Sequence, residues 1–213
     1  NNLPVGQFYH IAVDNAEPYN VYGGMQDNGS WVGPSAVWHT GGIRNEDWQE
    51  VLFGDGFDVQ PTGDGDVYAM YQGGAVNRVN LTTLGSTDIQ PVSPDSVPLR
   101  FAWNGALALD PYSQDGLYFG SQRLHHSPDR GRTWATLSGD LTTNDPEKLQ
   151  QATSGGLTID ATKAENHCTI LCIAPSAVRP DEIWVGTDDG RLQHTNDGGA
   201  TWTDHGAKLK GLP

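Results

Sequence analysis

The chain has 213 residues, of which 36% are hydrophobic and 18% charged, and its formal net charge is −14. This charge repels a phosphate backbone and an anionic lipid surface, which argues against nucleic-acid and membrane partners. Seven tryptophans and seven tyrosines supply large groups to bury, which argues against a disordered chain. The 27 glycines and 13 prolines fit short strands and tight turns, so the composition predicts an all-β protein.

Two segments in the first half each begin with a strand-like run, continue through a polar turn to a second run, and then reach another turn. The first comprises the runs 8–14 and 21–24, the turn 27–29 and Trp31. The second comprises the runs 57–61, 67–70 and 76–79, with the turns 63–65 and 73–74. Short runs punctuated by Asp-Gly and Gly-Gly turns are typical of β-hairpins, so both segments predict antiparallel sheets.

Two segments in the second half follow the same plan more closely. Each has a strand, a turn, a strand that ends in glycine, a hairpin, and an Asp-containing turn that leads to tryptophan. Gly120 precedes Trp134 by 14 positions and Gly186 precedes Trp202 by 16, as a longer hairpin loop would produce. Repeats of this length are typical of β-propeller blades.

The repeat therefore predicts a partial β-propeller of about four blades, each a four-stranded antiparallel sheet. The approximate blades are residues 1–50, 51–98, 99–145 and 165–213, with an insertion at 138–166. Within the insertion, 144–151 has a capping residue and an early proline, which predict one or two helical turns.

The two cysteines, Cys168 and Cys172, lie in the apolar run 168–173. On one strand they would share a face about 13 Å apart, which is too far for a disulfide. We expect both to be small core residues. Cysteine usage therefore does not indicate a compartment.

The pattern Ser/Thr-x-Asp-x-Gly-x-Thr-Trp occurs twice and resembles the Asp-box, or BNR, repeat of β-propellers. The resemblance assigns a structural role to Ser127, Asp129, Gly131, Trp134, Thr195, Asp197, Gly199 and Trp202. In such a turn the aspartate accepts backbone hydrogen bonds, the glycine takes a positive φ, and the tryptophan packs between sheets.

A wider resemblance covers nearly the whole chain and includes the segments 19–31, 54–57, 100–104, 138–145 and 185–190. These look like parts of large bacterial proteins that carry sortilin-like (VPS10-type) and BNR repeats. Such proteins are secreted or periplasmic and are often labelled glycosyl hydrolases. The resemblance implies an extracytoplasmic location and further blades. We therefore expect the chain, from Asn1 to 211–213, to be part of a longer propeller, whose remaining blades come from unseen sequence of the same chain or from a partner chain.

The first hypothesis for function is a non-catalytic propeller segment that binds a protein or glycan, or serves as a subunit of an assembly. Its candidate binding residues are Gln26, Asp27, Asn28, Trp31, Asp55, Asp58, Trp103, Asp188 and Asp189. We expect blade packing for Trp134, Trp184 and Trp202, whereas Trp38, Trp48 and Trp103 lie outside the box positions and are the candidates for solvent exposure.

The second hypothesis is part of a glycoside hydrolase, similar to xyloglucanases or sialidases, whose chemistry needs two carboxylates about 5–10 Å apart. Loop carboxylates are plentiful (Asp27, Asp55, Asp58, Asp64, Asp66, Asp188 and Asp189), but the sequence assigns no catalytic pair. The arginine cluster of a sialidase is not recognisable.

Cation binding is a third hypothesis. Asp55 with Asp58, and Asp64 with Asp66, offer oxygen ligands that suit calcium, although neither loop matches an EF-hand and Asp-Gly hairpin turns explain both. His125 and His126 are adjacent and would point to opposite faces of a strand, so we expect no zinc site.

Overall fold

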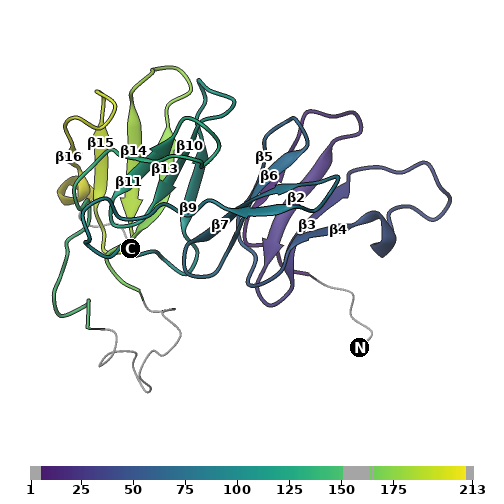
Figure 1. The fold of residues 1–213 in the computed structure, drawn as a ribbon, viewed down its shortest axis with the longest axis horizontal. Helices are drawn as coiled ribbons and strands as arrows, with labels where there is room; N and C mark the ends of the chain where they lie inside the picture. Colours follow the sequence, from purple (N-terminus) through teal and green to yellow (C-terminus); the bar gives the residue numbers. More distant parts are fainter. Residues whose placement is uncertain (1–5, 151–163, 165, 210–213) are drawn as a thin grey trace. The chain divides into compact units, whose positions relative to one another are not determined.

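The computed structural model describes residues 6–150, 164 and 166–209. In these residues the chain forms four antiparallel sheets of four strands each and no α-helix, which confirms the all-β prediction (Figure 1). Each sheet is a simple meander in which consecutive strands pair. The chain divides into two compact units, Asn1–Ile89 and Gln90–Pro213, each of which holds two sheets.

The first unit contains the first two sheets. The first sheet comprises β1 (Ile11–Val13), β2 (Asn20–Met25), β3 (Gly29–Pro34) and β4 (Gln49–Leu52), with a short 3₁₀ turn, η1 (Asn45–Asp47), before β4. The second sheet comprises β5 (Val59–Pro61), β6 (Asp66–Tyr71), β7 (Ala75–Asn80) and β8 (Ser86–Asp88).

The core of the first unit lies between its two sheets. One face of the first sheet supplies Tyr22, Val32 and Val51, and the facing side of the second sheet supplies Val59, Val67, Ala69 and Val79. Side chains alternate between the faces of a strand, so Tyr22 and Val32 point inward while Ile11 and Val13, on the other face of the first sheet, stay exposed.

The second unit contains the third and fourth sheets. The third comprises β9 (Ala106–Leu109), β10 (Leu117–Gly120), β11 (Leu124–Ser127) and β12 (Ala135–Thr136). The fourth comprises β13 (Ile170–Pro175), β14 (Ile183–Thr187), β15 (Leu192–Thr195) and β16 (Thr203–Asp204), followed by the 3₁₀ turn η3 (Gly206–Leu209).

The core of the second unit lies between these two sheets. Ala106 and Leu124 of the third sheet pack with Ile170, Ile183 and Val185 of the fourth. Tyr118, Leu137, Ile173 and Trp202 pack around them.

A glycine of the second strand lets the next sheet approach closely in both units. A side chain at Gly24 would lie 2.2 Å from the backbone nitrogen of Phe57, and one at Gly120 would lie 2.7 Å from the Ile170 side chain. The Gly24 amide donates to the Phe57 carbonyl at 3.0 Å, and the Ile170 amide donates to the Ser121 carbonyl at 2.8 Å. Glycine at these two positions is therefore required by sheet packing.

The helix expected at 144–151 is a single turn in the described residues. The Leu149 amide donates to the Asp145 carbonyl at 3.1 Å, and the Asp145 side chain caps the turn by accepting from the Glu147 amide at 2.9 Å. Gln151 lies outside the described residues, as do 152–163 and 165 of the insertion.

The expectation that both cysteines are core residues is wrong for one of them. Cys168 is buried before β13 begins, with φ 58°, but Cys172 is exposed on the strand. A β-bulge between Ile170 and Cys172 inserts Leu171 and breaks the alternation on which that expectation rested.

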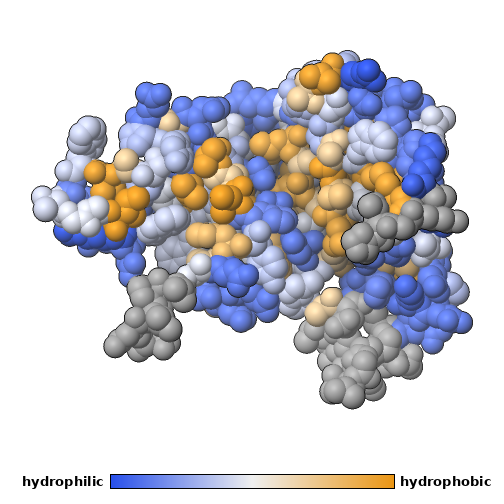
Figure 2. Space-filling view, turned by 180° about the vertical axis from the view of Figure 1, so that it is seen from behind, coloured by the Kyte–Doolittle hydropathy of each residue, from blue (hydrophilic) through white to orange (hydrophobic). Residues whose placement is uncertain are grey.

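Hydrophilic residues cover most of the face shown in Figure 2, with hydrophobic residues in smaller groups between them. Among the described residues the most exposed large apolar side chain is Trp38, which is fully accessible to solvent. It lies in the loop between β3 and β4, where Asp47 bonds to His39 at 3.1 Å and to the Arg44 amide at 2.6 Å. Trp38 is therefore displayed on a loop with internal hydrogen bonds, as expected for that residue.

The other two tryptophans that are candidates for solvent exposure are partly covered. Trp48 stacks on Phe8 with ring centres 6.1 Å apart and lies over Gly33, and Trp103 is half-buried before β9. Trp48 is therefore not open to solvent, because its ring packs on Phe8, and Trp103 is only partly exposed.

Candidate functional site

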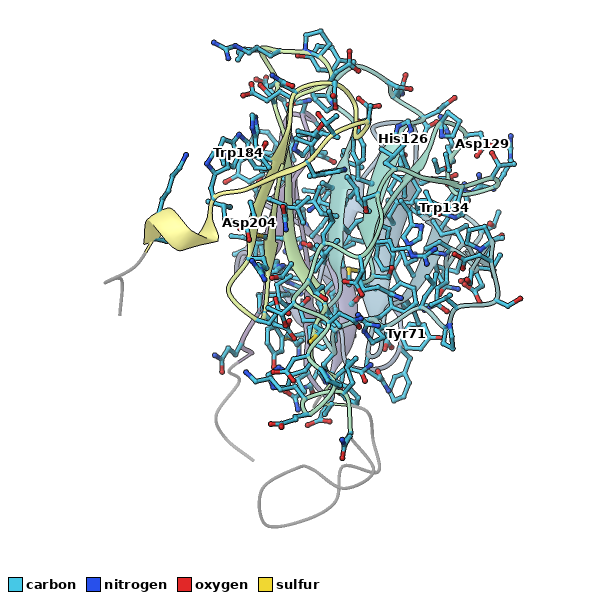
Figure 3. The ribbon with its side chains drawn as sticks, turned by 90° about the vertical axis from the view of Figure 1, so that its left-hand side faces the viewer. Tyr71, His126, Asp129, Trp134, Trp184 and Asp204 are labelled. Carbon is cyan, nitrogen blue, oxygen red and sulfur yellow. The ribbon has the colours of Figure 1, made fainter. Side chains whose placement is uncertain are left out.

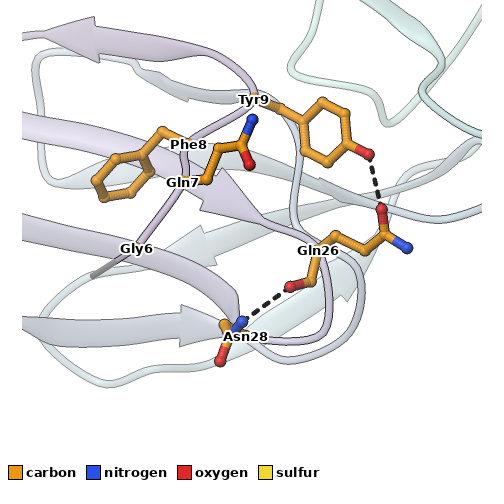
Figure 4. A pocket seen from close by; sticks show the side chains of 6 residues that line it. All are labelled: Gly6, Gln7, Phe8, Tyr9, Gln26 and Asn28. Carbon is orange, nitrogen blue, oxygen red and sulfur yellow. Dashed lines mark hydrogen bonds between the residues drawn. The ribbon is translucent and has the colours of Figure 1, made fainter. Parts of the chain in front are cut away.

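A cavity of about 310 Å3 lies beside the β2–β3 hairpin of the first unit (Figure 4). Its lining residues are Gly6, Gln7, Phe8, Tyr9, Gln26 and Asn28. Two of the candidate binding residues, Gln26 and Asn28, therefore line one cavity together with a segment that precedes β1.

The hairpin turn places Gln26 and Asn28 on the cavity wall. Asp27 takes a positive φ of 61°, and the Asn28 amide donates to the Met25 carbonyl at 3.2 Å. The Asn28 side chain donates to the Gln26 carbonyl at 2.9 Å, which ties the two residues to each other. Aspartate tolerates this left-handed conformation better than most residues, which explains its place in the turn.

Neighbouring residues brace this turn. The Asp55 carboxylate accepts from the Asp27 amide at 2.9 Å, and Gln72 accepts from the Asp55 amide at 2.9 Å. The Trp31 indole donates to the Asn28 carbonyl at 2.5 Å. Asp27, Trp31 and Asp55 thus hold the turn, while Gln26 and Asn28 face the cavity.

Tyr9 forms another part of the cavity wall. Its hydroxyl donates to the Gln26 side-chain oxygen at 2.7 Å, and its ring makes an edge contact with Phe57 at 4.8 Å. The Tyr9 amide also donates to the Gly24 carbonyl at 3.0 Å, which fixes Tyr9 beside β2.

The cavity lining is neutral and polar. Gln26 accepts from Tyr9 through its side-chain oxygen, so its amide nitrogen remains available as a donor. Asn28 donates through its nitrogen, so its side-chain oxygen remains available as an acceptor. The Gln7 side chain makes no hydrogen bond to another described residue, and none of the lining residues is charged.

Asp58 lies at the start of the second sheet with little exposure. Its carboxylate lies 3.3 Å from the His10 ring and 3.3 Å from the Gln60 amide nitrogen. Of the other carboxylates considered for calcium, Asp64 accepts from the Thr62 hydroxyl and Asp66 from the Asn80 amide. No group of three or more His, Cys, Asp or Glu in the described part of the chain could hold a metal ion.

The candidates Asp188, Asp189 and Trp103 belong to the second unit. Asp188 accepts from the amide and the hydroxyl of Thr169 at 2.9 and 3.2 Å. Asp189 accepts from the amide and hydroxyl of Thr143, both at 2.7 Å, and from the Thr187 hydroxyl. Burial raises the pKa of Asp189, but these hydrogen bonds outweigh it and hold the pKa below its ordinary value. A general acid needs the opposite shift.

The turns at Ser127–Trp134 and Thr195–Trp202 have matching hydrogen bonds. Asp129 accepts from the Thr133 amide and hydroxyl at 2.8 and 2.7 Å, and Asp197 accepts from those of Thr201 at 2.9 and 2.6 Å. Ser127 and Thr195 donate to the aspartates and accept from the amides of Gly131 and Gly199. In both turns the aspartate therefore closes a local network.

The two tryptophans that end these turns pack differently. The Trp202 indole donates to the Gly199 carbonyl at 3.1 Å and to the carbonyl of Leu137, the residue after β12, at 3.4 Å. It therefore connects the fourth sheet to the end of the third. The Trp134 ring centre lies 6.4 Å from that of Phe119 in its own sheet.

Comparison with known proteins identifies the fold. No protein-family model and no curated protein matches the sequence. The structure matches the GH74 xyloglucanase of Xanthomonas campestris with a TM-score of 0.52 and 15% identity, over 84% of this chain and 25% of that one. It matches the GH74 enzyme of Niastella koreensis with a TM-score of 0.52 and 18% identity, over 93% of this chain and 29% of that one.

The four sheets are β-propeller blades. The likeness at this identity is one of fold, and the chain spans about a quarter of the length of these two enzymes. Their activity therefore does not transfer to this chain. No helix in the described residues is long and apolar enough to cross a membrane.

The sequence interpretation missed Gln7, Phe8 and Tyr9 as part of the cavity. A signal was available, because pairing the first strand of a blade with the second places residues before β1 beside the β2–β3 turn. The pair Phe8-Tyr9 would then lie next to Gln26.

Proposed function

We propose that this chain is a non-catalytic, extracytoplasmic β-propeller segment that binds a neutral polar ligand, a glycan or a peptide. Gln7, Gln26 and Asn28 supply the hydrogen-bonding groups, and Tyr9 supplies an aromatic wall. The hydroxyl groups of sugars and the amides of peptides both suit this lining. Two further parts of the proposal are that Asp129 and Asp197 belong to structural Asp-box turns, and that calcium has no required role.

One observation carries the proposal: the cavity is lined by neutral amide and aromatic side chains and by no carboxylate. Such a lining can bind and orient a ligand, but it offers no carboxylate or histidine for general acid or base catalysis. The candidate carboxylates nearby are engaged in the structure itself, Asp55 with the hairpin turn and Asp58 with His10.

The test is calorimetric titration of the purified chain with neutral oligosaccharides in one arm and with uncharged extended peptides in the other. We expect binding in one arm, and a loss of about tenfold in affinity for Gln26→Ala, because one or two ligand hydrogen bonds disappear. Gln60→Ala is the matched control, since Gln60 bonds to Asp58 and does not line the cavity.

The same samples test the alternative of a glycoside hydrolase. Reducing-end assays on xyloglucan, β-glucan and sialyl substrates should show no turnover. Hydrolysis that disappears in Asp55→Asn or Asp188→Asn would overturn the non-catalytic proposal. If Gln26→Ala bound the ligand with unchanged affinity, the ligand site would not be this cavity.

A further inference from the structure

In the described part of the chain, one face of the fourth sheet is uncovered, although it repeats the surface on which the next sheet packs in the first and third sheets. In the first sheet Tyr22 is followed two positions later by Gly24, and in the third sheet Tyr118 is followed by Gly120. The fourth sheet repeats this arrangement with Trp184 and Gly186. Residues two apart on a strand share a face, so each pair marks one face of its sheet.

Both earlier pairs are covered by the next sheet. Tyr22 belongs to the core shared with the second sheet, and the backbone at Phe57 lies against Gly24. Tyr118 packs against the core shared with the fourth sheet, and Ile170 lies against Gly120. The aromatic residue and the glycine thus form a seat into which the following sheet fits.

The seat at Trp184 and Gly186 has no such cover among the described residues. A side chain at Gly186 would meet only the sulfur of Cys172, its neighbour across the strands. Ile183 and Val185 of the same strand point the other way, into the core of the second unit. In Figure 3 Trp184 accordingly lies on the side of the fourth sheet away from His126 and Trp134.

The open seat is built from ordered aromatic contacts. Trp184 stacks on His194 with ring centres 4.1 Å apart, and it lies 5.2 Å from His205, which covers one end of the face. His194 is also 3.3 Å from Glu182, which fixes its ring. The side chains that would receive a partner are therefore already positioned.

The covered seats identify the chemistry of the occupant. In both, the covering sheet presents aliphatic residues from its first two strands: Val59, Val67 and Ala69 in the second sheet, and Ile173, Ile183 and Val185 in the fourth. By strand register, Ile11 of the first sheet corresponds to Val59 and Ile173. Ile11 and Val13 are 67% and 56% exposed, so the β1 edge of the first sheet offers aliphatic side chains of the required kind. Phe8 and Trp48 cover Gly23 and Gly33 further across the same face.

We propose that two copies of this chain associate head to tail, with the Ile11 and Val13 face of one copy on the Trp184 and Gly186 seat of the other. The contact joins two different surfaces, so it leaves a free seat and a free aliphatic face at the two ends and can extend or close into a ring. This proposal is independent of ligand binding at the cavity.

Sedimentation velocity of the whole chain at physiological ionic strength tests the proposal. We expect species larger than the monomer that increase with protein concentration. Gly186→Val fills the seat and Ile11→Asp puts a charge on the aliphatic face, so each variant alone should sediment as a monomer. Val178→Asp is the matched control, because Val178 is 85% exposed and belongs to neither face, and it should associate like the parent.

Mixing the two blocked variants gives the sharpest result. The Ile11→Asp chain keeps a free seat and the Gly186→Val chain keeps a free aliphatic face, so the mixture should form a heterodimer and nothing larger. Alkylation of Cys172, which lies beside Gly186, should abolish association of the parent chain. A parent chain that stays monomeric at all concentrations, or variants that associate as it does, would overturn the proposal.

Discussion

At Asp197 a single carboxylate closes a turn through the amide and hydroxyl of Thr201 and the hydroxyl of Thr195. We expect Asp197→Ala to lower the Tm by roughly 5 °C, because the turn loses these hydrogen bonds. Differential scanning calorimetry of the variant beside the parent chain measures this. An unchanged Tm together with lost ligand binding would contradict the structural role.

The pKa of Asp197 also predicts a response to acid. The side-chain and backbone hydrogen bonds from Thr201, with that from Thr195, lower it to about 2. A lowered folded-state pKa contributes stability that is present above pH about 4 and is lost as pH falls toward 2. The fall in Tm between pH 4 and 2 should therefore be shallower for Asp197→Ala than for the parent. Equal slopes would mean that another group dominates acid unfolding.

His125 predicts a second pH dependence. Burial, with a smaller effect from the Arg123 charge, lowers its pKa to about 4, and its ring bonds to Ser121 at 2.8 Å. The stability that neutral His125 contributes is thus complete above pH about 6.5 and is lost as pH falls through 4. In an NMR titration we expect its ring signals to stay constant from pH 8 to pH 5. A midpoint near 6.5 would show that the side chain is open to solvent.

At the scale of the element, the position of Gly24 on β2 predicts the cost of adding a side chain where two sheets pack closely. A methyl group at this position would meet the Phe57 backbone at 2.2 Å, where only movement of the second sheet could make room. We expect Gly24→Ala to destabilise the first unit by about 3 kcal/mol, toward the upper end of overpacking costs. Chemical denaturation measures this. Gly139→Ala is the matched control, because no atom lies within 4 Å of the added methyl group and φ is not positive there, as at Gly24.

The same elements show how far sequence reasoning reaches. The strands and hairpins could be predicted because alternation and Asp-Gly turns are local, and the paired Gly120 and Gly186 exposed the repeat. The bulge at Leu171 could not be predicted, since the apolar run 168–173 is equally compatible with a regular strand that has no extra residue. The cavity could not be predicted either, because Tyr9 reaches Gln26 only through the pairing of β1 with β2.

At the scale of the whole molecule, the net charge of −14 governs encounters with other macromolecules. We expect no retardation of duplex DNA and no binding to vesicles rich in anionic lipid at low salt, where any attraction would be strongest. Gel shift and vesicle co-sedimentation measure these. Binding in either assay would reveal a local basic surface and contradict the exclusion of such partners.

The loop that displays Trp38 has a consequence for how the protein emits light. A fully hydrated indole emits at longer wavelengths than the packed rings of Trp31, Trp48 or Trp202, so Trp38 contributes the red edge of the spectrum. The emission maximum of the folded chain will therefore make its tryptophans look more hydrated on average than they are. In Trp38→Phe we expect the emission maximum to move to shorter wavelength without any change in fold. Iodide should also quench the emission of this variant much less than that of the parent chain.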